Sequence, residues 1–370
     1  QLLIRSNQPT DVNTIAALAA FGSRDPGTAL AGRSVVITGV TSGIGEELAI
    51  TLLRLGATVY GLARSQTKLA AFAATHGALA GSFKPVLCEL SDLDSVARAA
   101  DSIAREVPEG AGLDYLVNNA GIHYGSPLTM MSVDTTTKHD GLDRCFVVNY
   151  LSHVLLTEKL LPLLLKAKSE ARVIQISSSY HWQSSAAMLR MGEDSGPHAA
   201  NSQVRDRFQR ELAYANSKLA QVYHARALAK RRKTQKVKFI SACPAWVGTN
   251  IAPEGLARRG LALLAFSPNQ GIYSALSSMF RPEIESGDFV GNSNLISNLP
   301  PVTWVITSSF ASVQFPQVRK VLTDAFAGLL LVLQKYDFSY HVQRSSPESY
   351  DEAVGDALHE WSLKKLSDWL

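Results

Sequence analysis

SVVITGVTSGIGEELA, residues 34–49, is the stretch of this sequence that decides its fold. It opens on a short, β-branched apolar run, which is typical of a buried strand. Gly39, Gly43 and Gly45 follow, and a pattern with helical spacing then begins, so the stretch predicts a strand, a tight turn and a helix N-terminus. The free backbone N–H groups of such a turn and the positive end of the helix dipole attract a pyrophosphate. Because the spacing is not that of the commonest dinucleotide fingerprint, turn-forming glycines without a ligand stay an alternative.

Composition and charge fit a globular protein with its own core. The chain has 370 residues, of which 46% are hydrophobic and 18% charged, enough for one large domain or two ordinary ones. Its dense basic run, 230–233, with Lys236 and Lys238 close behind, is predicted at a helix C-terminus, where cations suit the dipole. Nucleic-acid binding is not expected, because aromatic interleaving and a second basic patch are missing. A peripheral membrane contact stays open.

The cysteines and the apolar runs bear on the compartment. Cys88, Cys145 and Cys243 lie far apart without CxxC spacing, which predicts buried free thiols in a reducing, intracellular compartment and neither disulfides nor a metal site. Apolar windows fall short of the ~18 residues of a membrane span. The chain begins at Gln1 rather than Met, so an organelle or a membrane surface also stays open as its location.

Strands and helices alternate along the chain. Helices are expected at 46–55, 66–76 and 93–107, the last capped by Ser91 or Asp92, and strands at 34–38, 57–63, 83–88, 113–117, 172–176 and 237–242. This alternation predicts an α/β fold with a doubly wound parallel sheet of Rossmann type, whose strand ends form a ligand crevice. We assign residues 31–295 to this single domain, 1–30 to an N-terminal extension, and 296–370 to a C-terminal extension that packs on the domain.

The end of the second strand bears on the cofactor. An acidic residue there would accept a hydrogen bond from a ribose 2′-hydroxyl, whereas a basic residue accommodates a 2′-phosphate. Ala63 occupies the acidic position, and Arg64 and Ser65 follow it. We therefore expect a preference for NADP(H), the alternative being that Arg64 is an ordinary surface arginine.

Several polar residues stand out further along the chain. Asn149 falls in an apolar helical context that begins near residue 140, so its amide needs a specific partner. Tyr214 and Lys218 are one turn apart on a predicted helix that starts at residue 214, and an ammonium there would lower the pKa of the phenol. A serine at the strand end 177–179 could hydrogen-bond the carbonyl or alcohol oxygen on which such a phenol acts. Tyr-x-x-x-Lys also occurs as a surface pair, and only the surrounding motifs favour an acid/base role.

Together these motifs resemble the short-chain dehydrogenase/reductase family over about residues 32–295. The resemblance rests on TGVTSGIG at 38–45, NNAG at 118–121, Asn149, Ser178 and Tyr214-x3-Lys218. DGL at 140–142, NYLSHVLLT at 149–157 and, more weakly, the tail 346–362 resemble the retinol dehydrogenase and WW-domain oxidoreductase branch.

The resemblance implies a role for each matching residue. Tyr214 would be the general acid/base, Lys218 would lower its pKa and bind the nicotinamide ribose, and Ser178 would orient the substrate oxygen. Ser177 or Ser179 could replace Ser178 if the alignment slips by one. Asn149 would hold a water that links Lys218 to solvent. Cofactor-binding positions implied in the same way are Gly39, Ser42, Gly43, Ile44, Gly45, Arg64, Ser65, Glu89, Leu90, Asn119, Ala120, Tyr214, Lys218, Val247 and Thr249, the last toward the carboxamide.

The sequence departs from the family pattern at three places. Glu89 replaces the usual Asp beside the adenine, Ala245 replaces the usual Gly after Pro244, and the polar insertion at about 180–210 lengthens the path from Ser178 to Tyr214. Neither substitution removes a chemical group, so catalysis is still expected.

The branch resemblance and the apolar run 260–266 suggest an apolar, lipid-like substrate such as a retinoid, steroid or long-chain carbonyl. The run would be a hydrophobic lid or, equally on pattern, an ordinary buried helix. A second hypothesis is an accessory subunit of a larger assembly that keeps the fold, motivated by 1–30, the insertion and the aromatic-rich segment 296–345. A homodimer or a larger assembly fits either hypothesis.

Overall fold

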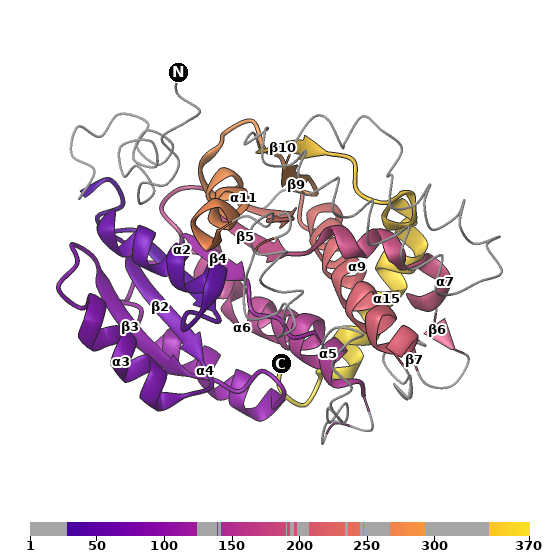
Figure 1. Ribbon diagram of the computed structural model, residues 1–370, viewed down its shortest axis with the longest axis horizontal. Helices are drawn as coiled ribbons and strands as arrows, with labels where there is room; N and C mark the ends of the chain where they lie inside the picture. The colour runs from indigo at the N-terminus through magenta and orange to yellow at the C-terminus, as the bar shows by residue number, and fades with distance from the viewer. Residues whose placement is uncertain are drawn as a thin grey trace, which may run out of the picture.

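A twisted eight-stranded sheet forms the centre of the molecule (Figure 1). The computed structural model describes residues 28–123, 139, 142–189, 191–192, 196–197, 207–233, 236–244, 247, 267–292 and 340–370, and the structural statements below concern these. The strand order is β10-β9-β8-β5-β4-β1-β2-β3. All neighbours pair in parallel except β10, which runs antiparallel to β9 at the edge. The strands are β1 Ser34–Thr38, β2 Thr58–Ala63, β3 Ser82–Leu87, β4 Tyr115–Asn118, β5 Ala171–Ile176, β8 Val237–Ala242, β9 Phe289–Asn292 and β10 Tyr340–Gln343.

Helices cover both faces of the sheet. On one face lie α2 (Gly43–Arg54), α3 (Gln66–His76) and α11 (Pro268–Phe280). On the other lie α4 (Leu93–Glu106), α6 (Ser152–Leu165) and α9 (Arg207–Arg231), with α15 (Glu352–Lys365) beside α9 (Figure 1). The remaining short elements are α5 Arg144–Phe146, η2 Val147–Leu151, η3 Ser179–Gln183, α7 Ala186–Leu189, β6 Met191–Gly192, β7 Gly196–Pro197 and η4 Pro347–Tyr350.

Successive side chains of β1 pack alternately into the two hydrophobic cores, one on each face of the sheet. Val36 joins the core under α4, α6 and α9, whereas Val35 and Ile37 join the core under α2 and α11. All three are fully buried, as the period-two geometry of a central strand requires. The predicted Rossmann-type fold is confirmed.

The strand order reverses between β1 and β4, which pair through residues 35–37 and 115–117. In open α/β sheets the ligand crevice forms outside the carboxyl ends of the strands at this point. The glycine turn follows β1, and Asn119 follows β4. The topology therefore brings together two motifs that lie more than 70 residues apart in the sequence.

Three elements differ from the sequence-based expectation. α9 begins at Arg207 rather than at residue 214. The expected long helix around Asn149 is interrupted by the π-helical turn η2 between α5 and α6. The C-terminal segment 296–370, expected to pack on the domain, also supplies β10, the antiparallel edge strand of the sheet.

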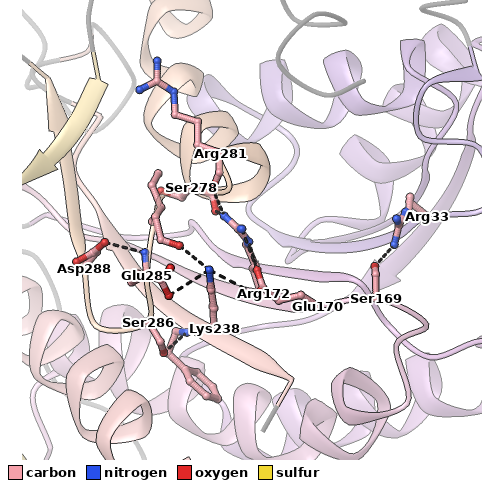
Figure 2. A network of polar contacts seen from close by, with 12 residues as sticks. Arg33, Ser169, Glu170, Arg172, Lys238, Ser278, Arg281, Glu285, Ser286 and Asp288 are labelled. Carbon is pink, nitrogen blue, oxygen red and sulfur yellow. Dashed lines mark hydrogen bonds and ion pairs between the residues drawn. The ribbon is translucent and has the colours of Figure 1, made fainter. Parts of the chain in front are cut away.

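At the other end of the sheet, where the parallel strands begin, a polar network connects strands and helices (Figure 2). Arg172 of β5 donates to the carbonyls of Ser278 and Arg281 at the C-terminal end of α11, at 3.0 and 2.7 Å. Lys238 of β8 donates to the carbonyl of Ile284 at 3.0 Å. Cations at the last carbonyls of a helix satisfy acceptors that have no partner within the helix. This network fixes α11 against β5 and β8 at the end where the strands begin. The carboxyl ends of the strands, where the ligand crevice is expected, take no part in it.

The basic run predicted at a helix end is confirmed there, since α9 ends at Arg231. Its cations pair with α15: Lys230 Nζ lies 2.7 Å from Glu352 and Arg231 Nη2 lies 2.8 Å from Glu360. Such exposed pairs contribute little, because water and salt screen them. Most of the docking energy of α15 therefore comes from apolar residues such as Leu358, which is fully buried in the core.

Candidate active site

The glycine turn after β1 forms a cradle that excludes side chains. Gly39 and Gly43 have φ of +78° and +63°, which favour glycine. A Cβ on Gly45 would lie 2.2 Å from the carbonyl oxygen of Gly39 and 2.5 Å from Nδ2 of Asn119. Ser42 precedes α2 in an extended conformation, and its side chain makes no capping hydrogen bond. The N–H groups of the first turn of α2 thus have no side-chain cap from Ser42, which fits a pyrophosphate as their partner.

Ile44 and Val247 lie on one side of this cradle. A Cβ on Gly271 of α11 would come within 2.7 Å of Val247 and 3.1 Å of Ile44. Gly271 therefore lets two residues that the family resemblance assigns to the cofactor approach each other, although they are far apart in sequence.

Thr38 connects the cradle to the end of β4. Its Oγ1 accepts hydrogen bonds from the backbone N–H groups of Asn119 and Ala120, both at 2.9 Å. The Asn119 amide in turn donates to the carbonyl of Thr38 at 2.9 Å. Asn119 and Ala120 are thereby fixed beside Gly39 at the point where the strand order reverses.

The Thr38 hydroxyl also fixes the tautomer of His153. Because Thr38 Oγ1 already accepts two N–H hydrogen bonds, the Thr38 hydroxyl donates its own proton to His153 Nε2, 3.1 Å away. Nδ1 then carries the ring proton and donates to the carbonyl of Asn149 at 3.0 Å. Burial lowers the pKa of His153 to about 3, so the ring is neutral. Sequence reasoning missed His153, because a histidine in an apolar helix reads as core.

The residues at the end of β2 are those expected to distinguish a ribose 2′-hydroxyl from a 2′-phosphate. Ala63 is buried, and Arg64 is exposed without an ion pair or side-chain hydrogen bond to any other described residue. Ser65 is the N-cap of α3, where its hydroxyl accepts from the Lys68 N–H at 3.3 Å. Arg64 is therefore the free basic group at this strand end, and Ser65 already has a structural role.

Glu89 and Leu90 occupy the loop after β3. The carboxylate of Glu89 accepts from the backbone N–H and the hydroxyl of Ser91, at 3.0 and 2.8 Å. Leu90 is buried and packs in the core beside α4. The side chain of Glu89, which is longer than that of the Asp usual in the family, is thus held by hydrogen bonds within its own loop.

Asn149 sits in the π-helical turn η2 and is fully buried. Its Oδ1 accepts from the Ile122 N–H at 2.8 Å, and its Nδ2 donates to the Ile122 carbonyl and to Ser217 Oγ, at 3.0 and 2.9 Å. Cys145 Sγ lies 3.1 Å from the same Nδ2. The expectation that Asn149 has specific partners is met, and the turn is of the kind that often marks functional sites.

Ser178, Tyr214 and Lys218 converge beside Asn149. Ser178 hydrogen-bonds the side chain of Tyr214. Lys218 Nζ donates to the Ile176 carbonyl at 2.8 Å and to Gln221 Oε1 at 3.0 Å. The hydroxyl of Ser177 donates to the carbonyl of Lys218, so it has a structural partner and Ser178 is the serine that faces the phenol.

The electrostatics of Tyr214 differ from the expectation. Burial raises the pKa of the phenol above its usual value, and only the hydrogen bond with Ser178 lowers it appreciably. Burial also lowers the pKa of Lys218 to about 8. The amine points at the Ile176 carbonyl and lies 5.5 Å from the centroid of the Tyr214 ring, so it does not offset the burial of the hydroxyl.

Two aromatic residues that sequence reasoning missed surround Tyr214. The rings of His123 and Tyr180 contact the Tyr214 ring edge-on, with centroids 4.6 and 5.6 Å away. Burial lowers the pKa of His123 to about 4, and its Nε2 is buried without a partner among the described residues. His123 directly follows the NNAG motif and Tyr180 follows the serine strand end, and position alone could have indicated them.

Several predicted features lie outside the described residues. These are Thr249, Ala245, the run 260–266, the N-terminal 27 residues and most of the segment 296–345. The insertion at 180–210 is described only in part, as η3, α7 and the two-stranded ribbon β6–β7. All three cysteines are buried free thiols, as predicted. Among the described parts of the chain, no helix is long and apolar enough to cross a bilayer.

Known proteins match this arrangement. The family pattern described as short chain dehydrogenase matches residues 33–189. Retinol dehydrogenase 11 of Mus musculus is 31% identical over 264 residues, covering 70% of this chain and 76% of that protein. Polyprenol dehydrogenase of Mus musculus is 30% identical over 270 residues, covering 69% and 73%. The structure of the Pseudomonas aeruginosa RhlG/NADP active-site complex is similar with a TM-score of 0.53 at 26% identity, covering 72% of this chain and 97% of that one.

Proposed function

The chain belongs to the short-chain dehydrogenase/reductase family, and from this premise we propose that it is an NADP(H)-dependent oxidoreductase acting on an apolar, lipid-like alcohol or carbonyl. An oxidoreductase with a nicotinamide cofactor follows from the family. The choice of NADP(H), the substrate class and the residue roles are our proposal. The observation that carries it is the convergence of Ser178, Tyr214 and Lys218 at the carboxyl end of the sheet.

The cradle suits a dinucleotide, because Gly39, Gly43 and Gly45 leave the N-terminus of α2 open to a phosphate. Bound NADP(H) would supply the hydride donor or acceptor. The Tyr214 hydroxyl would give its proton to the carbonyl oxygen during reduction and take it back during oxidation. The Ser178 hydroxyl, already bonded to the phenol, would hold the same oxygen.

Lys218 and Asn149 would support the proton transfer. The low pKa of Lys218, about 8, lets its amine gain or lose a proton near neutral pH. A Cβ on Gly121 would lie 3.3 Å from Asn149 Oδ1 and 3.4 Å from Lys218 Nζ, so the two side chains border one point. A water there would connect Lys218 to solvent, as the family resemblance implies.

Two observations support the finer parts of the proposal. The exposed guanidinium of Arg64, unpaired among the described residues, suits a 2′-phosphate, and RhlG of P. aeruginosa forms an NADP complex. The rings of His123 and Tyr180 beside Tyr214 make an aromatic surface at the reacting position. Two relatives are named for the isoprenoid alcohols retinol and polyprenol.

The test measures NADPH-dependent reduction across retinal, a long-chain aldehyde, a steroid ketone and a short sugar aldehyde. We expect turnover with the apolar carbonyls. Tyr214→Phe should abolish turnover while retaining NADPH binding by titration, whereas Tyr115→Phe, which removes a phenol from the start of β4, should retain both. Wild-type rates in Tyr214→Phe would exclude the proposed mechanism, and activity confined to the sugar aldehyde would exclude the substrate class.

A further inference from the structure

Three helices on the face away from α2 and α11 bring metal-ligating side chains to one point. Glu158 comes from α6, His224 from α9 and His359 from α15. One ligand atom from each lies within 4.8 Å of the other two. The three residues are so far apart in sequence that they form no motif, which explains why the sequence indicated no metal.

Each of these residues has one buried polar atom without a hydrogen-bond partner among the described residues. The atoms are Glu158 Oε1, His224 Nε2 and His359 Nδ1. His224 and His359 are 1% and 3% exposed. Leaving a buried polar atom unpaired costs ~1–3 kcal/mol, so three in one place point to a shared partner.

We propose that Glu158, His224 and His359 bind Zn²⁺, with water as the fourth ligand. Two imidazole nitrogens and one carboxylate oxygen are a donor set that tetrahedral zinc accepts. The protein contributes no thiolate here, which disfavours the softer ions. The site lies on the helical layer, away from the cradle, and its role would be to fasten α15 to α6 and α9.

The surrounding residues suit a metal's second shell. Arg232 Nη2 donates to Glu158 Oε2 at 2.9 Å, which orients the carboxylate and leaves Oε1 free. Gln175 Nε2 lies 3.2 Å from His224 Nδ1, and Gln175 Oε1 is buried without a partner among the described residues. A half-turn of this amide lets Oε1 accept from Nδ1–H, which gives Nε2 the lone pair that a metal needs.

Access and charge set the expected affinity. The side chains of Glu158 and Arg232 are 11% and 24% exposed, so an ion could enter on their side. The positive charge of Arg232 repels a dication, and the site carries only one carboxylate. We therefore expect Zn²⁺ to bind more weakly here than at a site with several anionic ligands and no neighbouring cation.

The experiment uses the full chain freed of metal by a chelator and titrated with Zn²⁺ by calorimetry. The expected result is about one Zn²⁺ per chain, with a rise in the unfolding temperature. Co²⁺ in its place should give the strong visible bands of a tetrahedral ion. His359→Gln and Glu158→Gln should each weaken binding at least about tenfold, whereas His76→Gln on α3 should not.

Three results would overturn the proposal. One is no Zn²⁺ binding by the wild type, which would indicate a buried water as the shared partner. Another is equal binding by the wild type and by Glu158→Gln. The third is an octahedral spectrum for bound Co²⁺. This measurement uses the wild type, so it tests the proposal even if His359→Gln fails to fold.

Discussion

Replacing Lys218 with Met should change how the stability of the protein depends on pH. Burial lowers the pKa of this amine from its usual 10.5 to about 8. Below about pH 8 both the folded and the unfolded chain are protonated, and the folded state bears the full cost of a buried cation. Between pH 8 and 10.5 only the unfolded chain holds the proton, so stability rises with pH. The total gain is about 3 kcal/mol, at about 1.4 kcal/mol per pH unit.

Lys218→Met abolishes this pH dependence. It also removes the hydrogen bonds to the Ile176 carbonyl and Gln221, but a neutral amine donates them too, so that loss is nearly constant with pH. The free energy of unfolding of the variant minus that of the wild type should therefore fall by about 3 kcal/mol between pH 7.5 and 10.5.

Urea unfolding followed by tryptophan fluorescence at several pH values measures this difference. Lys68→Met, at an exposed lysine of α3, is the control and should show no such trend. A difference for Lys218→Met that stays flat across the range would mean that the amine titrates normally, and the proton-relay role proposed for it would lose its basis.

Three further predictions concern the cradle and its neighbours. Gly45→Ala places a Cβ 2.2 Å from the Gly39 oxygen, so we expect NADPH binding to weaken at least about tenfold and stability to fall by ~1–3 kcal/mol; unchanged calorimetric titrations would contradict the proposed pyrophosphate site. Arg64→Asp should weaken NADPH binding and strengthen NADH binding in direct titrations. A wild type that prefers NADH would contradict the assignment of Arg64 to the cofactor site. Asn149→Leu leaves the Ile122 backbone groups unpaired, which should cost ~2–4 kcal/mol in thermal unfolding and lower kcat, and a variant as stable as the wild type would show that these bonds contribute little.

Local patterns in the sequence were enough to predict the core of the fold. The strand, glycine turn and helix at 34–49 are specified by residues next to one another, and β2, α3 and α4 follow from the same alternation. The convergence of Tyr214 with Ser178 was predictable because both positions carry recognisable motifs.

Other features depend on contacts that sequence spacing does not reveal. His153 matters because Thr38 and Asn149 lie on either side of its ring. Asn149 is one helical turn away, but Thr38 is 115 positions away in the sequence, so spacing does not reveal this contact. The direction of the Tyr214 pKa depended on how deeply the phenol is buried, which the Lys218 spacing could not indicate. β10 was missed because four residues that pair at a sheet edge carry little periodicity.

The late position of β10 and α15 in the chain has a consequence for biosynthesis. A ribosome releases the strands from β1 to β9 before the residues that complete the sheet edge and cover α9 have been made. Until then the apolar residues that pack against Leu358 and Leu366, both fully buried in the finished core, lack these partners. A nascent chain stalled in this interval exposes apolar surface and an unpaired edge on β9, which makes it a client for chaperones. Premature stop codons between residues 250 and 340 should therefore produce protein that is degraded or aggregates, although every residue proposed for catalysis has already been synthesised.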